Sequence, residues 1–212
     1  FKKIHKIKSV NGRLEEIKEL PNRSKIFLDY AHTPEALKTA INALKEHYKK
    51  KITVVFGCGG ERDKSKRKLM GKIANQLCNK VIITDDNPRN EKPKIIREQI
   101  LSVIKKNKFK EIPGRKKAII YALKNSDPFE IILVAGRGHE TYQDFGKRKI
   151  SLSDKKIIQS FNSKKINTKI NYFKNNSTLI KKILKNKKNF YFEGVSINSK
   201  SIKKNNLFVA IK

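Results

Sequence analysis

The residues with the clearest potential for chemistry form a tetrapeptide just after the apolar run of residues 81–84: Asp86, Asn87, Pro88 and Arg89. It places a carboxylate, an amide and a guanidinium at the exit of an expected strand, and its proline favours a turn. A carboxylate can pair with an ammonium group, and a guanidinium can bind a carboxylate through two hydrogen bonds. The set could therefore bind an amino acid, although a plain turn has the same composition.

Three further polar clusters each follow an apolar run: residues 29–34, 57–64 and 136–140. In the first cluster, Asp29 and His32 could hold a ribose or the edge of a nucleotide. The helix expected to follow favours anions at its N-terminus. The alternative is that Thr33 only caps that helix.

The two glycine-containing clusters add charges of both signs. Residues 57–64 do not match a phosphate-loop pattern, but their glycines would let the backbone approach a ligand. Taken alone, each cluster could be an ordinary loop. Together, two arginines (Arg62 and Arg89) and two acids (Asp86 and Glu140) would suit a ligand that carries both carboxylates and ammonium groups.

Alternating strands and helices are expected to position these clusters from residue 24 to about 160. Apolar runs predict strands at residues 26–28, 52–56, 81–84, 110–112 and 131–134. Apolar residues spaced three and four apart predict four helical faces: Leu37, Ala40, Ile41 and Leu44; Leu69, Ile73, Ala74 and Leu77; Ile96, Ile100, Val103 and Ile104; Ala118, Ile119, Ala122 and Leu123.

This alternation predicts an α/β fold with a Rossmann-like, mostly parallel sheet and helices on both faces. Ligands of such sheets bind at the carboxyl ends of the strands. All four polar clusters fall at such ends, which favours one shared site.

The composition limits the classes of partner. The formal net charge of +32 comes mainly from lysines spread along the whole chain, and tryptophan is absent. Dispersed lysines indicate solvated faces, so we expect neither specific nucleic-acid binding nor membrane insertion. Cys58 and Cys78 lack metal-ligand spacing, which predicts no metal site of their own and a reducing, cytoplasmic location.

Taken together, the motifs resemble the C-terminal domain of the Mur ligases over about residues 10–160. The matching segments are residues 12–15, 29–34, 56–64 with Arg67, Leu69, Met70 and Gly71, then 84–89, 135–140 and 142–143. The resemblance implies an ATP-dependent ligase of peptidoglycan synthesis. In this family the motif at residues 86–89 marks the members that add meso-diaminopimelate to UDP-N-acetylmuramoyl-L-alanyl-D-glutamate, and lysine-adding relatives usually depart at its arginine.

The resemblance also implies roles for single residues. The diaminopimelate site would comprise Arg62, Asp86, Asn87, Arg89, Gly136 and Glu140. The ATP contacts would comprise Arg13, Asp29 and His32. ATP would phosphorylate the D-glutamate side chain, and the diaminopimelate amine would attack the acyl phosphate. The phosphate loop and most Mg²⁺ ligands belong to a central domain that this chain lacks, so we expect no catalytic residue here and no activity from residues 1–212 alone.

Four regions are expected along the chain. They are residues 1–15, the end of a central ATPase domain or a linker; 16–160, the amino-acid-binding domain; 161–190, a linker; and 191–212, the start of a second α/β domain. The last region resembles the N-terminal start of a D-alanyl-D-alanine-adding Mur ligase, with Ser199 near a UDP-sugar, although an unrelated strand pair is the alternative. The chain would then be a piece of a fusion of two ligases.

Three other interpretations remain open at this point. The domain could belong to a lysine-adding or a folylpolyglutamate-type ligase. It could be a basic nucleic-acid-binding module, or a remnant whose site no longer works.

Overall fold

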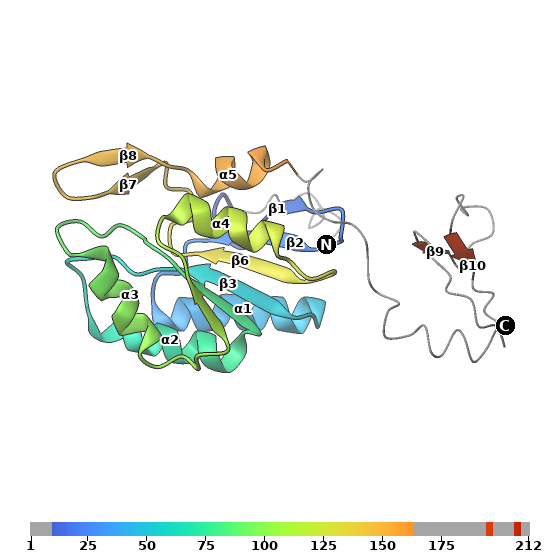
Figure 1. Cartoon of the computed structure of the whole chain (residues 1–212), viewed down its shortest axis with the longest axis horizontal. Helices are drawn as coiled ribbons and strands as arrows, with labels where there is room; N and C mark the ends of the chain where they lie inside the picture. Colours follow the sequence, from blue (N-terminus) through green and yellow to red (C-terminus); the bar gives the residue numbers. More distant parts are fainter. Residues whose placement is uncertain (1–9, 163–193, 197–205, 209–212) are drawn as a thin grey trace, which may run out of the picture. The chain divides into compact units, whose positions relative to one another are not determined.

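The computed structural model describes residues 10–162, 194–196 and 206–208. The chain divides into two compact units, residues 1–166 and 167–212. The strands described in the first unit are β1 Glu15–Glu19, β2 Lys25–Asp29, β3 Ile52–Phe56, β4 Lys80–Ile83, β5 Phe109–Glu111, β6 Ile131–Ala135, β7 Tyr142–Asp144 and β8 Lys149–Ser151. The helices are α1 Pro34–Tyr48, α2 Ser65–Leu77, α3 Pro93–Leu101, α4 Arg115–Lys124 and α5 Asp154–Ser160 (Figure 1).

The main sheet has the strand order β1-β2-β6-β3-β4-β5. The five strands from β2 to β5 in this order are parallel, and β1 pairs with β2 in the antiparallel sense. The last parallel strand in the sequence, β6, therefore lies between β2 and β3. This arrangement confirms the predicted Rossmann-like α/β fold.

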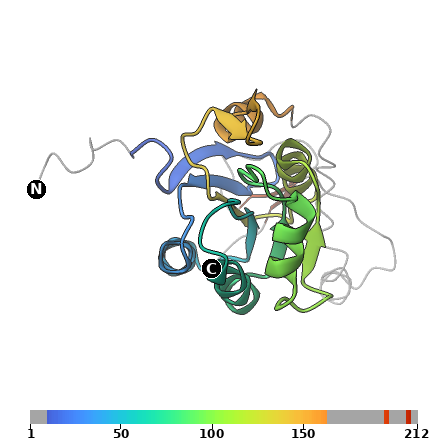
Figure 2. The ribbon, with the colours of Figure 1, turned by 90° about the vertical axis from the view of Figure 1, so that its left-hand side faces the viewer.

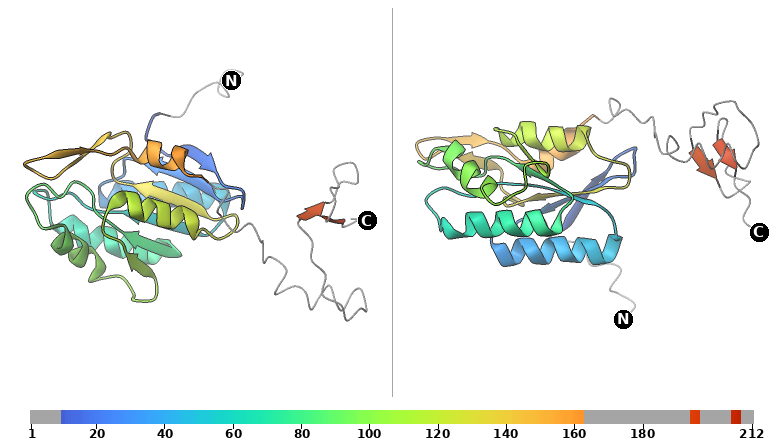
Figure 3. Two further views of the ribbon diagram at one scale, coloured as in Figure 1. Left: turned by 45° about the horizontal axis from the view of Figure 1, so that its top comes forward. Right: turned by 60° about the horizontal axis from the view of Figure 1, so that its bottom comes forward.

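Helices cover both faces of the sheet, as Figure 2 and the right-hand view of Figure 3 show. Side chains of α1, α2 and α3 pack with Phe27, Val54 and Phe56 on one face. Side chains of α4 and α5 pack with Ile26, Val55 and other alternate residues on the opposite face. Because alternate side chains enter the cores on opposite faces, the inner strands are largely apolar without alternation, as predicted.

Helix α1 begins as the sequence predicts. Thr33 has an extended backbone, and its hydroxyl accepts a hydrogen bond from the amide of Ala36 at 3.2 Å. Pro34 occupies the first turn, where its missing N–H costs nothing. The capping role of Thr33 is therefore confirmed.

Two helix predictions are wrong in part. The prediction placed Leu69 on the inward face of α2, but 47% of its surface is exposed, and Met70, Gly71 and Arg67 are buried in its stead. The buried guanidinium of Arg67 is compensated by ion pairing with Glu91 at 2.9 Å, so a charged residue takes a core position. Helix α3 was expected to carry Val103 and Ile104, but it ends at Leu101.

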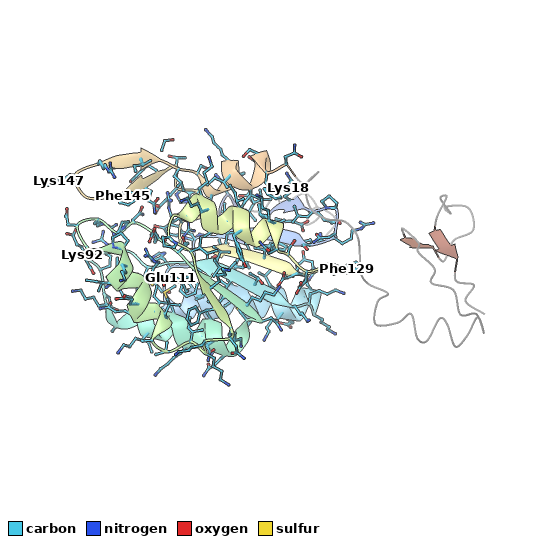
Figure 4. The ribbon with its side chains drawn as sticks, in the orientation of Figure 1. Lys18, Lys92, Glu111, Phe129, Phe145 and Lys147 are labelled. Atoms are coloured by element: carbon cyan, nitrogen blue, oxygen red, sulfur yellow. The ribbon has the colours of Figure 1, made fainter. Side chains whose placement is uncertain are left out.

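The β7–β8 hairpin, α5 and β1 were not predicted. The hairpin extends from the carboxyl end of the sheet, and Figure 4 labels Phe145 and Lys147 at its tip on the same side as Lys92. Phe129, just before β6, is labelled at the opposite end of the sheet.

In the second unit, β9 (Gly194–Ser196) and β10 (Asn206–Phe208) form a parallel pair. Ser199 and residues 163–190 of the expected linker lie outside the described residues. Among the residues that the structure describes, no helix has both the length and the apolar character needed to span a bilayer.

Candidate functional site

A cleft of about 630 Å³ opens where β2, β3, β4 and β6 end. Each of these four strand ends contributes one of the polar clusters. All six residues predicted to hold an amino acid line the cleft: Arg62, Asp86, Asn87, Arg89, Gly136 and Glu140. The structure therefore brings together side chains that lie far apart in the sequence, at the position expected for a ligand of a parallel sheet.

The turn at residues 86–89 is packed directly against the glycine-rich turn after β3. The amide of Gly60 donates to the carbonyl of Asn87 at 2.9 Å, and Arg89 Nη1 donates to the carbonyl of Gly60 at 2.8 Å. A Cβ at Gly60 would lie 1.9 Å from the carbonyl oxygen of Pro88. The close approach of the two turns thus requires a glycine at this position.

The β7–β8 hairpin supports the same turn from the other side. The amide of Asp144 donates to Asn87 Oδ1 at 2.9 Å, and the amide of Arg89 donates to the carbonyl of Asp144 at 3.0 Å. Gln143 Nε2 donates to the carbonyl of Asp86. These bonds hold Arg89 in a left-handed backbone conformation with φ of 52°, which a non-glycine residue seldom adopts.

Glu140 is oriented by two neighbours on the wall of the cleft. Its Oε2 accepts a hydrogen bond from Asn87 Nδ2 at 2.8 Å and another from Arg137 Nε at 3.2 Å. The bond from Asn87 joins the loop after β4 to the loop after β6. The carboxylate is therefore fixed before any ligand arrives.

Asp86 supplies a second carboxylate, at the floor of the cleft. Its side chain is buried, and its Oδ1 accepts a hydrogen bond from the amide of Asn87 at 2.7 Å. Burial raises the pKa of Asp86, and the positive charge of Arg115, with Nη1 at 3.8 Å from Oδ2, acts in the opposite direction. Gly136 leaves room for this carboxylate, since a Cβ there would lie 2.8 Å from Oδ2.

Two guanidinium groups border the cleft. Arg62 is exposed and forms no hydrogen bond or ion pair with any described residue. Arg89 is partly buried, and its Nε lies 3.8 Å from Asp144 Oδ2. A ligand carboxylate would give Arg62 the partner that the described residues do not supply.

The residues expected to contact ATP are arranged around Tyr30, which lines the cleft. The guanidinium of Arg13 lies 5.0 Å from the centre of the Tyr30 ring, and His32 Nδ1 lies 2.9 Å from the Tyr30 carbonyl oxygen. Both carboxylate oxygens of Asp29 accept backbone amides at 2.7 Å, from Leu14 and Ala31. Asp29 thus anchors the segment that carries Arg13, and His32 lines the cleft itself.

Sequence reasoning missed the buried residues behind the site. Arg115, Arg137 and Gln143 contact Asp86, Glu140 or their backbone, yet none was assigned a role. Arg137 lies within a cluster already identified, which is a signal that could have found it. Arg115 has no such signal because its partner, Asp154, is 39 residues away.

The described residues form no cluster suited to a metal ion. Within residues 10–162 and the two short strands, no group of three or more His, Cys, Asp or Glu side chains could hold a metal ion. Cys58 and Cys78 are both buried and unpaired, and burial raises the pKa of each thiol to about 12.

Comparisons with known proteins place the chain in a family. Residues 12–138 match the family described as Mur ligase, glutamate ligase domain. The chain is 49% identical over 156 residues to the UDP-N-acetylmuramoyl-L-alanyl-D-glutamate–2,6-diaminopimelate ligase of Rickettsia bellii (strain RML369-C), covering 73% of this chain and 32% of that protein. It is 48% identical over 161 residues to the protein of the same name from Buchnera aphidicola subsp. Baizongia pistaciae (strain Bp), covering 75% and 32%.

A solved structure with that name superimposes with a TM-score of 0.67 at 34% sequence identity, covering 75% of this chain and 33% of that one. The chain spans about a third of the length of the curated relatives it matches.

Proposed function

This chain belongs to the Mur ligase family through its glutamate ligase domain, and on that premise we propose that it is the amino-acid-binding part of a ligase that adds meso-diaminopimelate to UDP-N-acetylmuramoyl-L-alanyl-D-glutamate. The relatives that bear this name support the proposal. The observation that carries it is the charge pattern of the cleft.

Arg62 and Arg89 face the same cleft as Asp86 and Glu140. Diaminopimelate carries an ammonium and a carboxylate at each end, so two guanidiniums and two carboxylates complement it. Lysine lacks the second carboxylate and would leave one guanidinium without a partner. Because charge-assisted hydrogen bonds are about twice as strong as neutral ones, this difference favours diaminopimelate over lysine.

ATP would activate the acceptor by phosphorylating the D-glutamate side chain. The residues of this chain would bind and orient the incoming amino acid so that its amine lies beside the activated carbonyl. Arg13 and His32, grouped around Tyr30, would contact the nucleotide, and Asp29 would hold the Arg13 segment in place. Mg²⁺ would be held mostly by ligands on the central domain of the full-length protein, as the family resemblance implies.

Three wider assignments belong to the same proposal. Residues 16–160 would form the amino-acid-binding domain, and residues 191–212 would begin a second ligase of the D-alanyl-D-alanine-adding type, fused to the first. The enzyme would act in the cytoplasm, where its nucleotide substrates are made.

The test is steady-state kinetics of the full-length protein with meso-diaminopimelate and with L-lysine. We expect use of diaminopimelate, and a KM for it that rises about 10- to 150-fold in Arg89→Ala, corresponding to about 1.5–3 kcal/mol for charged hydrogen bonds. The KM for ATP should not change. Arg148→Ala is the matched control, because Arg148 is exposed on the hairpin and its guanidinium contacts only Phe145 among the described residues. An unchanged KM for diaminopimelate in Arg89→Ala would reject the assignment.

A further inference from the structure

A buried arginine lies behind the floor of the cleft. Arg115 is the first residue of α4, and its side chain is completely buried. Its Nε donates to Asp154 Oδ1 and Oδ2 at 3.0 and 2.9 Å, and its Nη2 donates to Oδ2 at 2.7 Å and to the carbonyl of Ala135 at 2.8 Å. These bonds fix the plane and direction of the guanidinium.

The remaining nitrogen of this guanidinium points toward the cleft. Arg115 Nη1 is buried and has no hydrogen-bond partner among the described residues. It lies 3.8 Å from Asp86 Oδ2, too far for a hydrogen bond but close enough for a strong charge interaction. A buried N–H group without a hydrogen-bond partner lowers the stability of the fold. The position of this group beside a carboxylate of the cleft therefore suggests a role in the site.

We propose that Arg115 is a positioning residue, which acts through Asp86 and keeps that carboxylate ionised and aimed at the incoming ammonium group of the amino acid. Asp154 in turn holds Arg115. The inference rests on the proposed function, and it extends the site to residues on α4 and α5 that do not line the cleft.

The charges around Asp86 support a specific role for Arg115. Besides Arg115, three titratable groups of the described residues interact electrostatically with the Asp86 carboxylate. They are Arg137 and Glu140 in the loop after β6, and Cys58 in the loop after β3. The Nε of Arg137 is bonded to Glu140, and its Nη2 is bonded to backbone carbonyls of Tyr142 and Leu152. Nη1 of Arg137 is also buried without a hydrogen-bond partner among the described residues, but the ion pair that reaches Asp86 comes from Arg115, at 3.8 Å. The negative charge of Glu140 disfavours a second carboxylate nearby.

Arg115 is therefore the main group that opposes the effect of burial on Asp86. Burial raises the pKa of Asp86, and the charge of Arg115 is the largest influence that lowers it. Without Arg115 the pKa of Asp86 should rise further, and a protonated Asp86 cannot pair with an ammonium group. Lysine could restore the charge but not the fork of hydrogen bonds that aims it.

The test is the pH dependence of the KM for meso-diaminopimelate in the full-length protein, for wild type, Arg115→Gln and Arg115→Lys. The KM of the wild type should rise toward acidic pH. In Arg115→Gln the inflection should move to higher pH by about one unit, equivalent to about tenfold in KM on the acidic side. At alkaline pH the KM should approach the wild-type value, and the KM for ATP should not change. Arg115→Lys should shift the inflection less.

Arg97→Gln is the matched control, because Arg97 is also a buried arginine but pairs with Asp85 and Glu111. The Arg97→Gln variant should have a lower free energy of unfolding than the wild type. The pH at which its KM for meso-diaminopimelate changes should stay at the wild-type value. In an Asp86→Asn background, Arg115→Gln should add no pH shift in titrations of diaminopimelate binding, which separates action through Asp86 from a general loss of structure.

The outcomes separate the two claims. An inflection that stays at the wild-type pH in Arg115→Gln would overturn the role of Arg115. If the glutamine variant does not fold, the same result in Arg115→Met, which keeps much of the side chain's bulk without its charge, would overturn it. A wild-type protein that fails to use diaminopimelate would instead overturn the proposed function.

Discussion

Replacing Gly60 by alanine should separate the two turns that form the cleft. The new Cβ would lie 1.9 Å from the carbonyl oxygen of Pro88 and 2.8 Å from its carbonyl carbon. An ordinary contact begins near 3.4 Å, so the turn at residues 86–89 would have to retreat by about 1.5 Å. Both atoms belong to the backbone and cannot rotate away.

The expected cost follows from two contributions. Overpacking a close contact typically costs about 1–3 kcal/mol. The same displacement would weaken the hydrogen bond from the Gly60 amide to the Asn87 carbonyl, now 2.9 Å long, at a cost of about 1 kcal/mol. Gly60→Ala should therefore lower the free energy of unfolding by about 2–4 kcal/mol.

Urea unfolding of the 212-residue chain measures this loss, and Gly59→Ala is the matched control. A Cβ at Gly59 would lie 3.0 Å from Arg89 Nη1, the mobile end of a side chain. This variant should lose less than about 1 kcal/mol, yet in the full-length protein it should raise the KM for diaminopimelate by displacing Arg89. Equal losses of stability in the two variants would refute the reasoning.

Three further predictions concern the groups around the cleft. Hydrogen bonds from Arg67 lower the pKa of Glu91 from 4.5 to about 2; the stability they provide should be complete above the unfolded value and lost as the pH falls toward about 2. In urea unfolding at several pH values, the free energy of unfolding should fall less steeply toward acidic pH in Glu91→Gln than in the wild type. An equal slope in the two proteins would contradict this prediction. Burial raises the pKa of Cys58 and Cys78 to about 12. Iodoacetamide should therefore label neither thiol at neutral pH unless the chain is unfolded. Rapid labelling of either thiol in the native protein would contradict this prediction. Asn87→Ala removes two side-chain hydrogen bonds across the cleft and should cost about 2 kcal/mol in urea unfolding; a loss below about 0.5 kcal/mol would mean that these bonds do not hold the cleft together.

The sequence was sufficient to predict the fold because the inner strands have a simple physical signature. Residues 52–56 and 131–135 are apolar except for Thr53 and are buried on both faces, as expected for strands of a sheet covered by helices on both sides. The position of the candidate site then followed from the strand ends. The edge strand β1 was missed because its residues, Glu15 to Glu19, are mostly charged and resemble a loop.

The buried charges could not be predicted in the same way. By residue type, Arg67 and Arg115 are expected at the surface. Each is buried because an acidic residue from a distant segment pairs with its guanidinium. Leu69 was predicted to be a core residue because its spacing fits the apolar face of the helix. In the structure Leu69 is exposed, and Arg67 occupies the inward position. A pairwise contact between distant segments leaves no periodic pattern in the sequence.

The position of β6 has a consequence for how the chain folds. The pair β1–β2 and the group β3–β4–β5 share no strand pairing with each other, and β6 joins them. Before β6 is in place, β2 and β3 each have one edge without a pairing strand. Completing the sheet then requires contacts between segments that are far apart in the sequence, and such contacts form slowly. Gly136 and Glu140 follow β6 directly, so the cleft should be completed in the same late step that closes the sheet.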